Sequence, residues 1–287
     1  MQTHGSLRWR TAVTDRRTFI AGLIASSLPG QRAWSDSSAP NVISTVYDLA
    51  WIPDGNSRQR CAYVIFAPWC PVCKDLYRAS RSWENDVQLR WIPSGTLDQR
   101  SLAHNATLAS SRSLQALNQL FTTGSLPSPR IDSQFSIDLN EGVIFSLEKA
   151  ITKITGRPYA YPTVIYESAT GPAGFAGLPQ DAERQLDATV IRQRDHRHEP
   201  RSSDWLSRII IEAAPSPDTL ITTRRAVPVH ALPFEDAPLV GVTPNAGQKP
   251  LRAIATSRDG TWYAFNLLGN GVRGFVSAGR ADLVVRT

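Results

Sequence analysis

A Cys-x-x-Cys pair, Cys70 and Cys73, directly follows an apolar run at residues 62–66 and opens an amphipathic stretch. The run has the length and composition of a buried β-strand, and the stretch after it places apolar side chains at helical spacing. Two cysteines at this spacing on the first turn of a helix can alternate between a dithiol and a disulfide. The pair therefore predicts a redox centre on a strand-to-helix connection.

Each cysteine has a predicted role. Cys70 would lie at the N-cap or in the first turn, where unpaired backbone N–H groups lower a thiol pKa from about 8.5 to between about 3.5 and 7.5, so it is the expected nucleophile. Pro71 suits the first helical turn, where its missing N–H costs nothing. Cys73, one turn further along on the apolar side, is the expected resolving thiol.

Two other uses of a Cys-x-x-Cys pair fit the chain less well. A zinc site needs four ligands, but the sequence has no second such pair, and His196 and His198 lie in a polar stretch that suits a solvated segment. A structural disulfide across two residues closes a very small loop and stabilises little. We therefore expect disulfide exchange, with no metal and no cofactor.

The N-terminal segment predicts an exported protein. An apolar run of about ten residues at 19–28 follows Arg16 and Arg17, whereas about 18 residues are needed to cross a bilayer. The paired arginines followed by Phe19 resemble a twin-arginine export signal, with an ordinary secretory signal as the alternative. Residues 1–35 are thus predicted to be a removable signal peptide, which places the mature chain in the periplasm.

The predicted signal carries most of the net charge. The whole chain has a formal charge of +6, and residues 1–35, with five arginines and one aspartate, supply +4 of it. The remaining +2 gives no reason to expect a nucleic-acid partner.

Cys61 is left over once Cys70 and Cys73 are paired. It begins the apolar run, so the expected role is that of a small buried hydrophobe. An intermolecular disulfide or a regulatory thiol is the alternative.

The composition of the chain changes near residues 213–218, a segment with two prolines. After it, short β-type segments and an Asn270-Gly271 hairpin turn suggest a small barrel. Before it, strand-like and helix-like segments alternate in the order of a thioredoxin fold with an inserted helical subdomain. That order is a strand at 62–66, the redox helix, a strand at 87–92, helical segments at 101–121 and 140–154, a proline-led strand at 161–166 and a helix at 205–212. We predict an α/β redox domain at 44–213 and an all-β domain at 218–287.

The segments that carry a family resemblance are residues 51–56, 63–66, 68–74, 87–92, 162–166 and 177–179. Together they resemble the catalytic domain of bacterial periplasmic thiol:disulfide interchange proteins of the DsbG/DsbC type. The resemblance implies a thiol:disulfide oxidoreductase whose partners are the thiols and disulfides of protein clients, together with a membrane redox partner.

The resemblance also implies the client-binding residues. Pro162 would be a cis proline lying against the cysteines, and Trp69, Pro71, Val72 and Tyr161 would line the same site. Tyr161 departs from the family, which usually has a small threonine before this proline, so redox tuning and client choice are in question. The isomerases of the family dimerise through an N-terminal domain that this chain has no room for, so the isomerase and oxidase directions both stay open.

Val64 lies six residues before Cys70, where the related stretch of thioredoxin carries a buried aspartate that accepts a proton. The absence of this aspartate argues against a reductant like cytoplasmic thioredoxin. Water or another carboxylate could take its place.

The segment that contains Trp262, Asn270-Gly271, Phe275 and Leu283 resembles a bacterial SH3-like barrel, with Phe275 in place of a tryptophan. Such modules bind peptides or cell-wall material, so the implied partner is an envelope protein or a cell-wall ligand. Trp262 and Phe275 suit a ligand platform and a core position equally. A second functional hypothesis is therefore an envelope adaptor, in which the barrel docks to a partner and redox activity is secondary.

Overall fold

The computed structural model describes residues 42–57, 60–83, 85–126, 134–189, 209–214, 216, 218–244, 247–268 and 271–285. All of them belong to one compact unit, Pro40–Thr287. The predicted signal peptide lies outside this part of the chain. Within the described ranges, no helix is long and apolar enough to cross a membrane.

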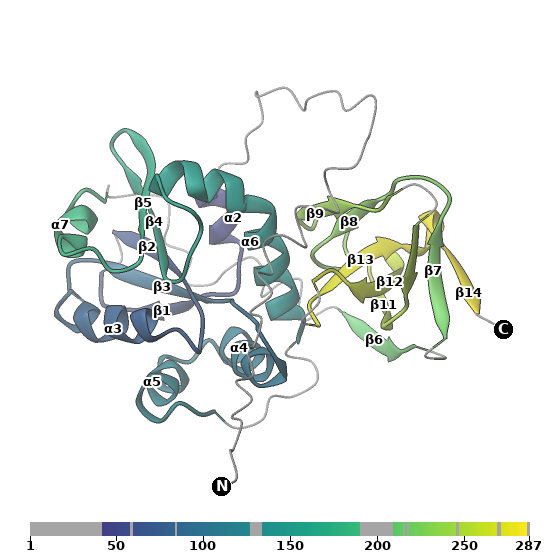
Figure 1. Cartoon of the computed structure of the whole chain (residues 1–287), viewed down its shortest axis with the longest axis horizontal. Coiled ribbons are helices and arrows are strands. Elements are labelled where there is room, and N and C mark those ends of the chain that lie inside the picture. Colours follow the sequence, from purple (N-terminus) through teal and green to yellow (C-terminus); the bar gives the residue numbers. More distant parts are fainter. Residues whose placement is uncertain are drawn as a thin grey trace, which may run out of the picture. The chain divides into compact units, whose positions relative to one another are not determined.

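A five-stranded mixed sheet is the centre of the part that carries the cysteines (Figure 1). Its strand order is β1-β3-β2-β4-β5, with β2 and β3 parallel and the other neighbours antiparallel. This order, with a helix joining the two parallel strands and an antiparallel hairpin beside them, is thioredoxin-like. The bounds are β1 Ile52–Asp54, β2 Cys61–Phe66, β3 Gln88–Pro93, β4 Thr163–Ser168 and β5 Gly171–Ala176.

Helices cover both faces of this sheet. The face that carries Val64, Phe66 and Trp91 packs against apolar side chains of α3 Pro71–Ala79, α5 Leu114–Thr123 and α7 Ala182–Asp187. The opposite face packs against α2 Val42–Tyr47 and α6 Gln134–Thr155. Val64 is fully buried because β2 lies in the middle of the sheet, which agrees with the continuous apolar run in the sequence.

The helical insertion that the sequence predicts between the strands at 87–92 and 161–166 is confirmed, and it lies between β3 and β4. It consists of α4 Gln99–Ser111, α5 and α6, and α4 packs against α6. The start of α4 is fixed by a capping box. The Asp98 side chain accepts from the Ser101 backbone N–H, and the Ser101 hydroxyl oxygen accepts from the Asp98 backbone N–H. The insertion therefore places α6, which is far from the cysteines in sequence, against one face of the five-stranded sheet.

The C-terminal segment forms two antiparallel sheets (Figure 1). One has the order β6-β11-β12-β13-β8-β9 and the other β10-β7-β14, and the described strands do not close into a single hydrogen-bonded barrel. The prediction of a β-rich C-terminal part is thus confirmed, whereas a closed barrel is not found. The bounds are β6 Ile210–Ala213, β7 Thr219–Thr223, β8 Pro228–His230, β9 Leu239–Val242, β10 Gly247–Pro250, β11 Ala253–Ser257, β12 Gly260–Asn266, β13 Arg273–Ser277 and β14 Asp282–Val285.

The predicted helix at 205–212 is wrong where the structure describes it. Residues 210–213 form strand β6, which pairs with β11. Three consecutive isoleucines at 209–211 favour an extended backbone, and a short apolar run has no periodicity that distinguishes strand from helix. Pairing with β11 makes residues 210–213 a strand.

Trp262 and Phe275 are core residues. Both are fully buried in the same apolar cluster as Leu139 and Val143 of α6 and Ile65 of β2. The hypothesis that they form a ligand platform is therefore wrong. Residues on both sides of the expected 213–218 boundary share this cluster, and the division into domains at 44–213 and 218–287 stays a prediction.

A buried ion pair joins α6 to the C-terminal sheet. Asp138 accepts from the backbone N–H and the Nε of Arg273, both at 2.8 Å, and Arg273 Nη2 lies 2.7 Å from the same carboxylate. Burial raises the pKa of Asp138 to about 6, against the opposing effect of the Arg273 charge. The guanidinium also lies over the ring of Phe135, 4.6 Å from its centroid.

Candidate redox site

Cys70 is the N-cap residue of α3, which is one of the two positions that the sequence predicts, the other being the first turn. Its backbone is extended, with φ −81° and ψ 117°, and its Sγ accepts a hydrogen bond from the backbone N–H of Cys73 at 3.3 Å. The Cys70 N–H donates to the carbonyl of Ala67 at 3.1 Å, which closes the turn between β2 and α3. Pro71 opens the helix, where no N–H is needed. The sulfur of Cys70 therefore lies at the positive end of the helix.

The two thiols have opposite ionisation tendencies. The pKa of Cys70 falls to about 7, chiefly because the Cys73 side chain donates a hydrogen bond to it, with help from the backbone N–H groups of Cys73 and Val72. Burial raises the pKa of Cys73 far above its usual range, and the neighbouring Cys70 adds to this rise. Near neutral pH, Cys70 is partly a thiolate while Cys73 keeps its proton. This division suits a nucleophile and a resolving thiol.

The segment just before β4 lies directly against the dithiol. Cys70 Sγ, as a thiol, donates to the carbonyl oxygen of Tyr161 at 3.4 Å, and the Tyr161–Pro162 peptide bond is cis. Pro162 is buried, and its carbonyl accepts from the N–H of Gly177 at 2.7 Å. The structure thus brings Tyr161 and Pro162 together with both cysteines.

The remaining predicted residues form the exposed rim of this site. Trp69 is 47% exposed and Val72 is 38% exposed, and Pro71 is exposed beside them. The ring of Trp69 meets the ring of Tyr161 edge to face, with centroids 6.0 Å apart. An apolar surface therefore flanks the sulfur of Cys70.

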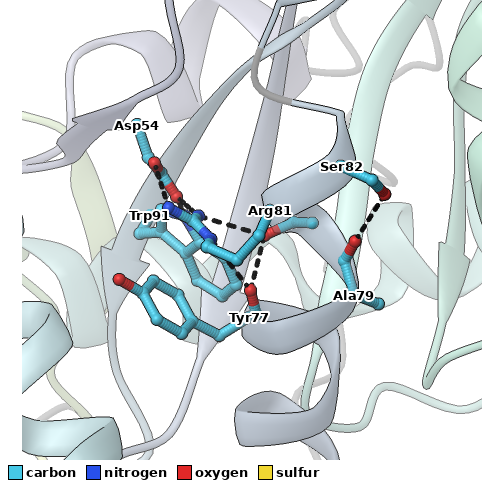
Figure 2. A network of polar contacts seen from close by, with 7 residues as sticks. Asp54, Tyr77, Ala79, Arg81, Ser82 and Trp91 are labelled. Atoms are coloured by element: carbon cyan, nitrogen blue, oxygen red, sulfur yellow. Dashed lines mark hydrogen bonds and ion pairs between the residues drawn. The ribbon is translucent and has the colours of Figure 1, made fainter.

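The far end of α3 is anchored by a carboxylate that the sequence reasoning missed (Figure 2). Asp54 of β1 is 3% exposed, and both of its oxygens accept from the guanidinium of Arg81, just after α3. The indole of Trp91 on β3 donates to the same carboxylate at 2.9 Å. Arg81 also donates from Nε to the carbonyl of Tyr77 at 3.1 Å and lies over its ring. These contacts fix the helix that presents Cys70.

A second missed group lies on the other side of the site. Ser94 and Gly95 follow β3, and both contact side chains of the site, while the carboxylate of Glu141 on α6 accepts from Ser94. One signal was available in the sequence, because Ile137 and Ile144 lie one helical turn before and after Glu141, which puts Glu141 on an apolar face of the helix. A charged residue at such a position is buried only when it is hydrogen-bonded.

Cys61 lies outside the site. It is half-buried at the start of β2, with Sγ 3.8 Å from Oε1 of Gln88. In the part of the chain that the structure describes, no group of three or more His, Cys, Asp or Glu side chains is placed to hold a metal ion.

The similarity of this chain to known proteins is remote. The sequence matches no protein-family model, and no curated protein matches it. Among solved structures, a periplasmic thioredoxin-like protein from Salmonella enterica serovar Typhimurium is similar, with 15% sequence identity and a TM-score of 0.34 over 52% of this chain and 95% of that chain.

Proposed function

We propose that this chain is an exported thiol:disulfide oxidoreductase that exchanges disulfides with protein clients through Cys70 and Cys73. The observation that carries the proposal is the pairing of an N-cap thiol whose pKa is about 7 with a buried thiol whose pKa is strongly raised. A pair of thiols with a structural role does not require different pKa values. A nucleophile and its resolving thiol do require them, because one must be ionised while the other keeps its proton.

The chemistry follows from these two states. The Cys70 thiolate attacks a client disulfide, forming a Cys70–client mixed disulfide and releasing one client thiolate. Cys73 then loses its proton and attacks Cys70 Sγ, which releases the second client thiolate and leaves a Cys70–Cys73 disulfide. Two electrons pass from the dithiol to the client, and the reverse sequence oxidises a client. A Cys70 pKa near 7 makes the sulfur both a competent nucleophile and a competent leaving group.

Protein clients are supported by the shape of the rim. Trp69, Pro71 and Val72 present apolar surface around a sulfur that is itself only slightly exposed. The carbonyl of Tyr161 faces Cys70 from the start of β4. An extended client segment would therefore meet apolar side chains and backbone groups together, whereas a small thiol would use neither.

We further propose that the exchange takes place in the periplasm after export through the twin-arginine signal at residues 1–35. Arg16 and Arg17 support this proposal. Replacing both with lysine tests the route, because the full-length precursor should then accumulate in the cytoplasm with its signal uncleaved.

Trapping a client tests the proposed function. A Cys73→Ala variant keeps the nucleophile but cannot resolve the mixed disulfide, so it should accumulate reducible covalent complexes with periplasmic proteins. The Cys70→Ala variant should form none, and Cys61→Ala should behave as the wild type. A Cys73→Ala variant that forms no complexes, in a strain where the wild type is expressed and folded, contradicts client exchange.

A further inference from the structure

A buried carboxylate lies beneath the loop that borders the redox site. Glu141 on α6 is 6% exposed, and its Oε1 accepts from the backbone N–H of Thr96 at 2.8 Å. Its Oε2 accepts from the hydroxyl of Ser94 at 3.1 Å. Two hydrogen bonds to one loop compensate for removing this group from water, and they tie the loop to α6.

The same loop contacts the rim of the site at two points. The Ser94 Oγ lies 3.3 Å from the hydroxyl of Tyr161, and the indole N–H of Trp69 donates to the carbonyl of Gly95. Gly95 has φ +73°, and a Cβ there would lie 2.5 Å from Cβ of Ala67 and 3.0 Å from the Tyr161 ring. The loop backbone at Gly95 therefore packs closely between Ala67, in the turn that leads to Cys70, and the ring of Tyr161.

Two asparagines also hold the loop backbone. Asn105 donates to the carbonyl of Ser94 at 2.8 Å, and Asn140 donates to the carbonyl of Pro93 at 3.0 Å. In these contacts the asparagines hold main-chain atoms. Glu141 differs from them, because it holds the Ser94 side chain that reaches Tyr161.

We propose that Glu141 is a positioning residue for the client-binding rim: through Ser94 and Thr96 it holds the loop that orients Trp69 and Tyr161 beside Cys70. This proposal rests on the proposed function. Since Tyr161 supplies the carbonyl that faces Cys70 and Trp69 the exposed apolar wall, a looser loop should impair reaction with an extended client more than reaction with a small disulfide.

The test compares Glu141→Ala with Glu141→Gln. Glutamine can accept from Thr96 and donate to Ser94, whose hydroxyl can then donate to Tyr161, so the bonds survive without the charge. Alanine removes them. Glu148→Ala is the matched control, because Glu148 is an exposed glutamate on the same helix.

Two substrates are assayed with each variant, a disulfide-bonded peptide and hydroxyethyl disulfide. We expect Glu141→Ala to lose about 10- to 100-fold in kcat/KM for the peptide and less than about threefold for the small disulfide. Glu141→Gln and Glu148→Ala should stay within about threefold of wild type for both. A parallel loss with both substrates, or equal losses for Gln and Ala, overturns the proposal.

A spectroscopic readout follows the loop directly. The indole N–H resonance of Trp69, assigned by its disappearance in Trp69→Phe, should exchange faster with solvent in Glu141→Ala and at the wild-type rate in Glu141→Gln. If Glu141→Ala does not fold, Tyr161→Phe replaces it, since it removes only the hydroxyl that meets Ser94. Tyr161→Phe should then show the selective loss on the peptide, and an unchanged peptide rate overturns the proposal.

The two proposals fail in different ways. A wild-type protein that exchanges neither disulfide contradicts the proposed function. A wild-type protein that exchanges both, with Glu141→Ala equally active on the peptide, contradicts only the role of Glu141.

Discussion

The Sγ of Cys70 lies 3.4 Å from the carbonyl oxygen of Tyr161, a residue 91 positions later in the chain. This contact joins the N-terminus of α3 to the start of β4, and it exists because β2 and β4 are neighbours in the sheet. The sulfur of Cys70 is therefore held between a helix end that stabilises its thiolate form and a carbonyl that faces its thiol form.

The ionisation of Cys70 should depend on Cys73. At pH values below about 7 the Cys70 thiol is protonated, so its alkylation by iodoacetamide should slow as the pH falls through 7. Cys73→Ala removes the hydrogen bond that contributes most to the lowered pKa and should move the midpoint upward, by about one unit or more. Cys73→Ser keeps a donor and should leave the midpoint closer to 7. Identical midpoints in the two variants would show that the Cys73 side chain does not tune Cys70.

Asp54 should be needed to hold α3 in place. Replacing it with alanine removes the carboxylate that accepts from both Arg81 and Trp91, so the free energy of unfolding in urea should fall by about 2–3 kcal/mol. The exposed pair of Asp75 and Arg78 on the same helix provides the control, and Asp75→Ala should change stability by less than about 1 kcal/mol. Equal effects of the two substitutions would contradict the anchoring role.

The pair of Asp138 and Arg273 should couple α6 to the C-terminal sheet. Asp138→Asn leaves a buried guanidinium without its counter-charge and should lower the free energy of unfolding by about 3–5 kcal/mol. Asp181→Asn, which breaks an exposed pair with Arg184, is the control and should leave the free energy of unfolding nearly unchanged. A similarly small loss for Asp138→Asn, measured by chemical denaturation, would show that the buried pair contributes little.

Trp262 should matter for stability, because it is fully buried. Trp262→Ala removes a core side chain and should lower the free energy of unfolding by about 3–5 kcal/mol. Trp69→Ala, at a position that is 47% exposed, should cost about 1 kcal/mol or less. The core assignment of Trp262 fails if its replacement leaves thermal and chemical stability unchanged.

The local parts of this structure could be predicted from the sequence. Cys70 and Pro71 at a helix start, and the apolar run of β2 before them, are governed by neighbours within a few residues. The placement of Cys70 at the start of the helix and of Cys73 on its apolar side follows from that pattern, and the structure shows both.

The parts that depend on contacts distant in sequence were missed. Glu141 contacts Ser94, which is 47 positions away in the sequence, and Asp54 contacts Arg81, which is 27 positions away. No periodicity in the sequence predicts either contact. The prediction of a helix at 205–212 failed for the same reason, since β6 is a strand because β11 lies beside it. Trp262 suited the core and a binding surface equally, and only tertiary packing distinguishes the two.

The reduction potential of the Cys70–Cys73 pair, measured by equilibration with a glutathione buffer and mass analysis of the peptide that contains both cysteines, tests the proposed function most directly. We expect a reversible two-electron couple between about −270 mV and −120 mV, the range of thioredoxin-like exchangers. A reduction potential below about −300 mV would instead indicate a structural disulfide. A pair that never forms a disulfide would exclude exchange altogether.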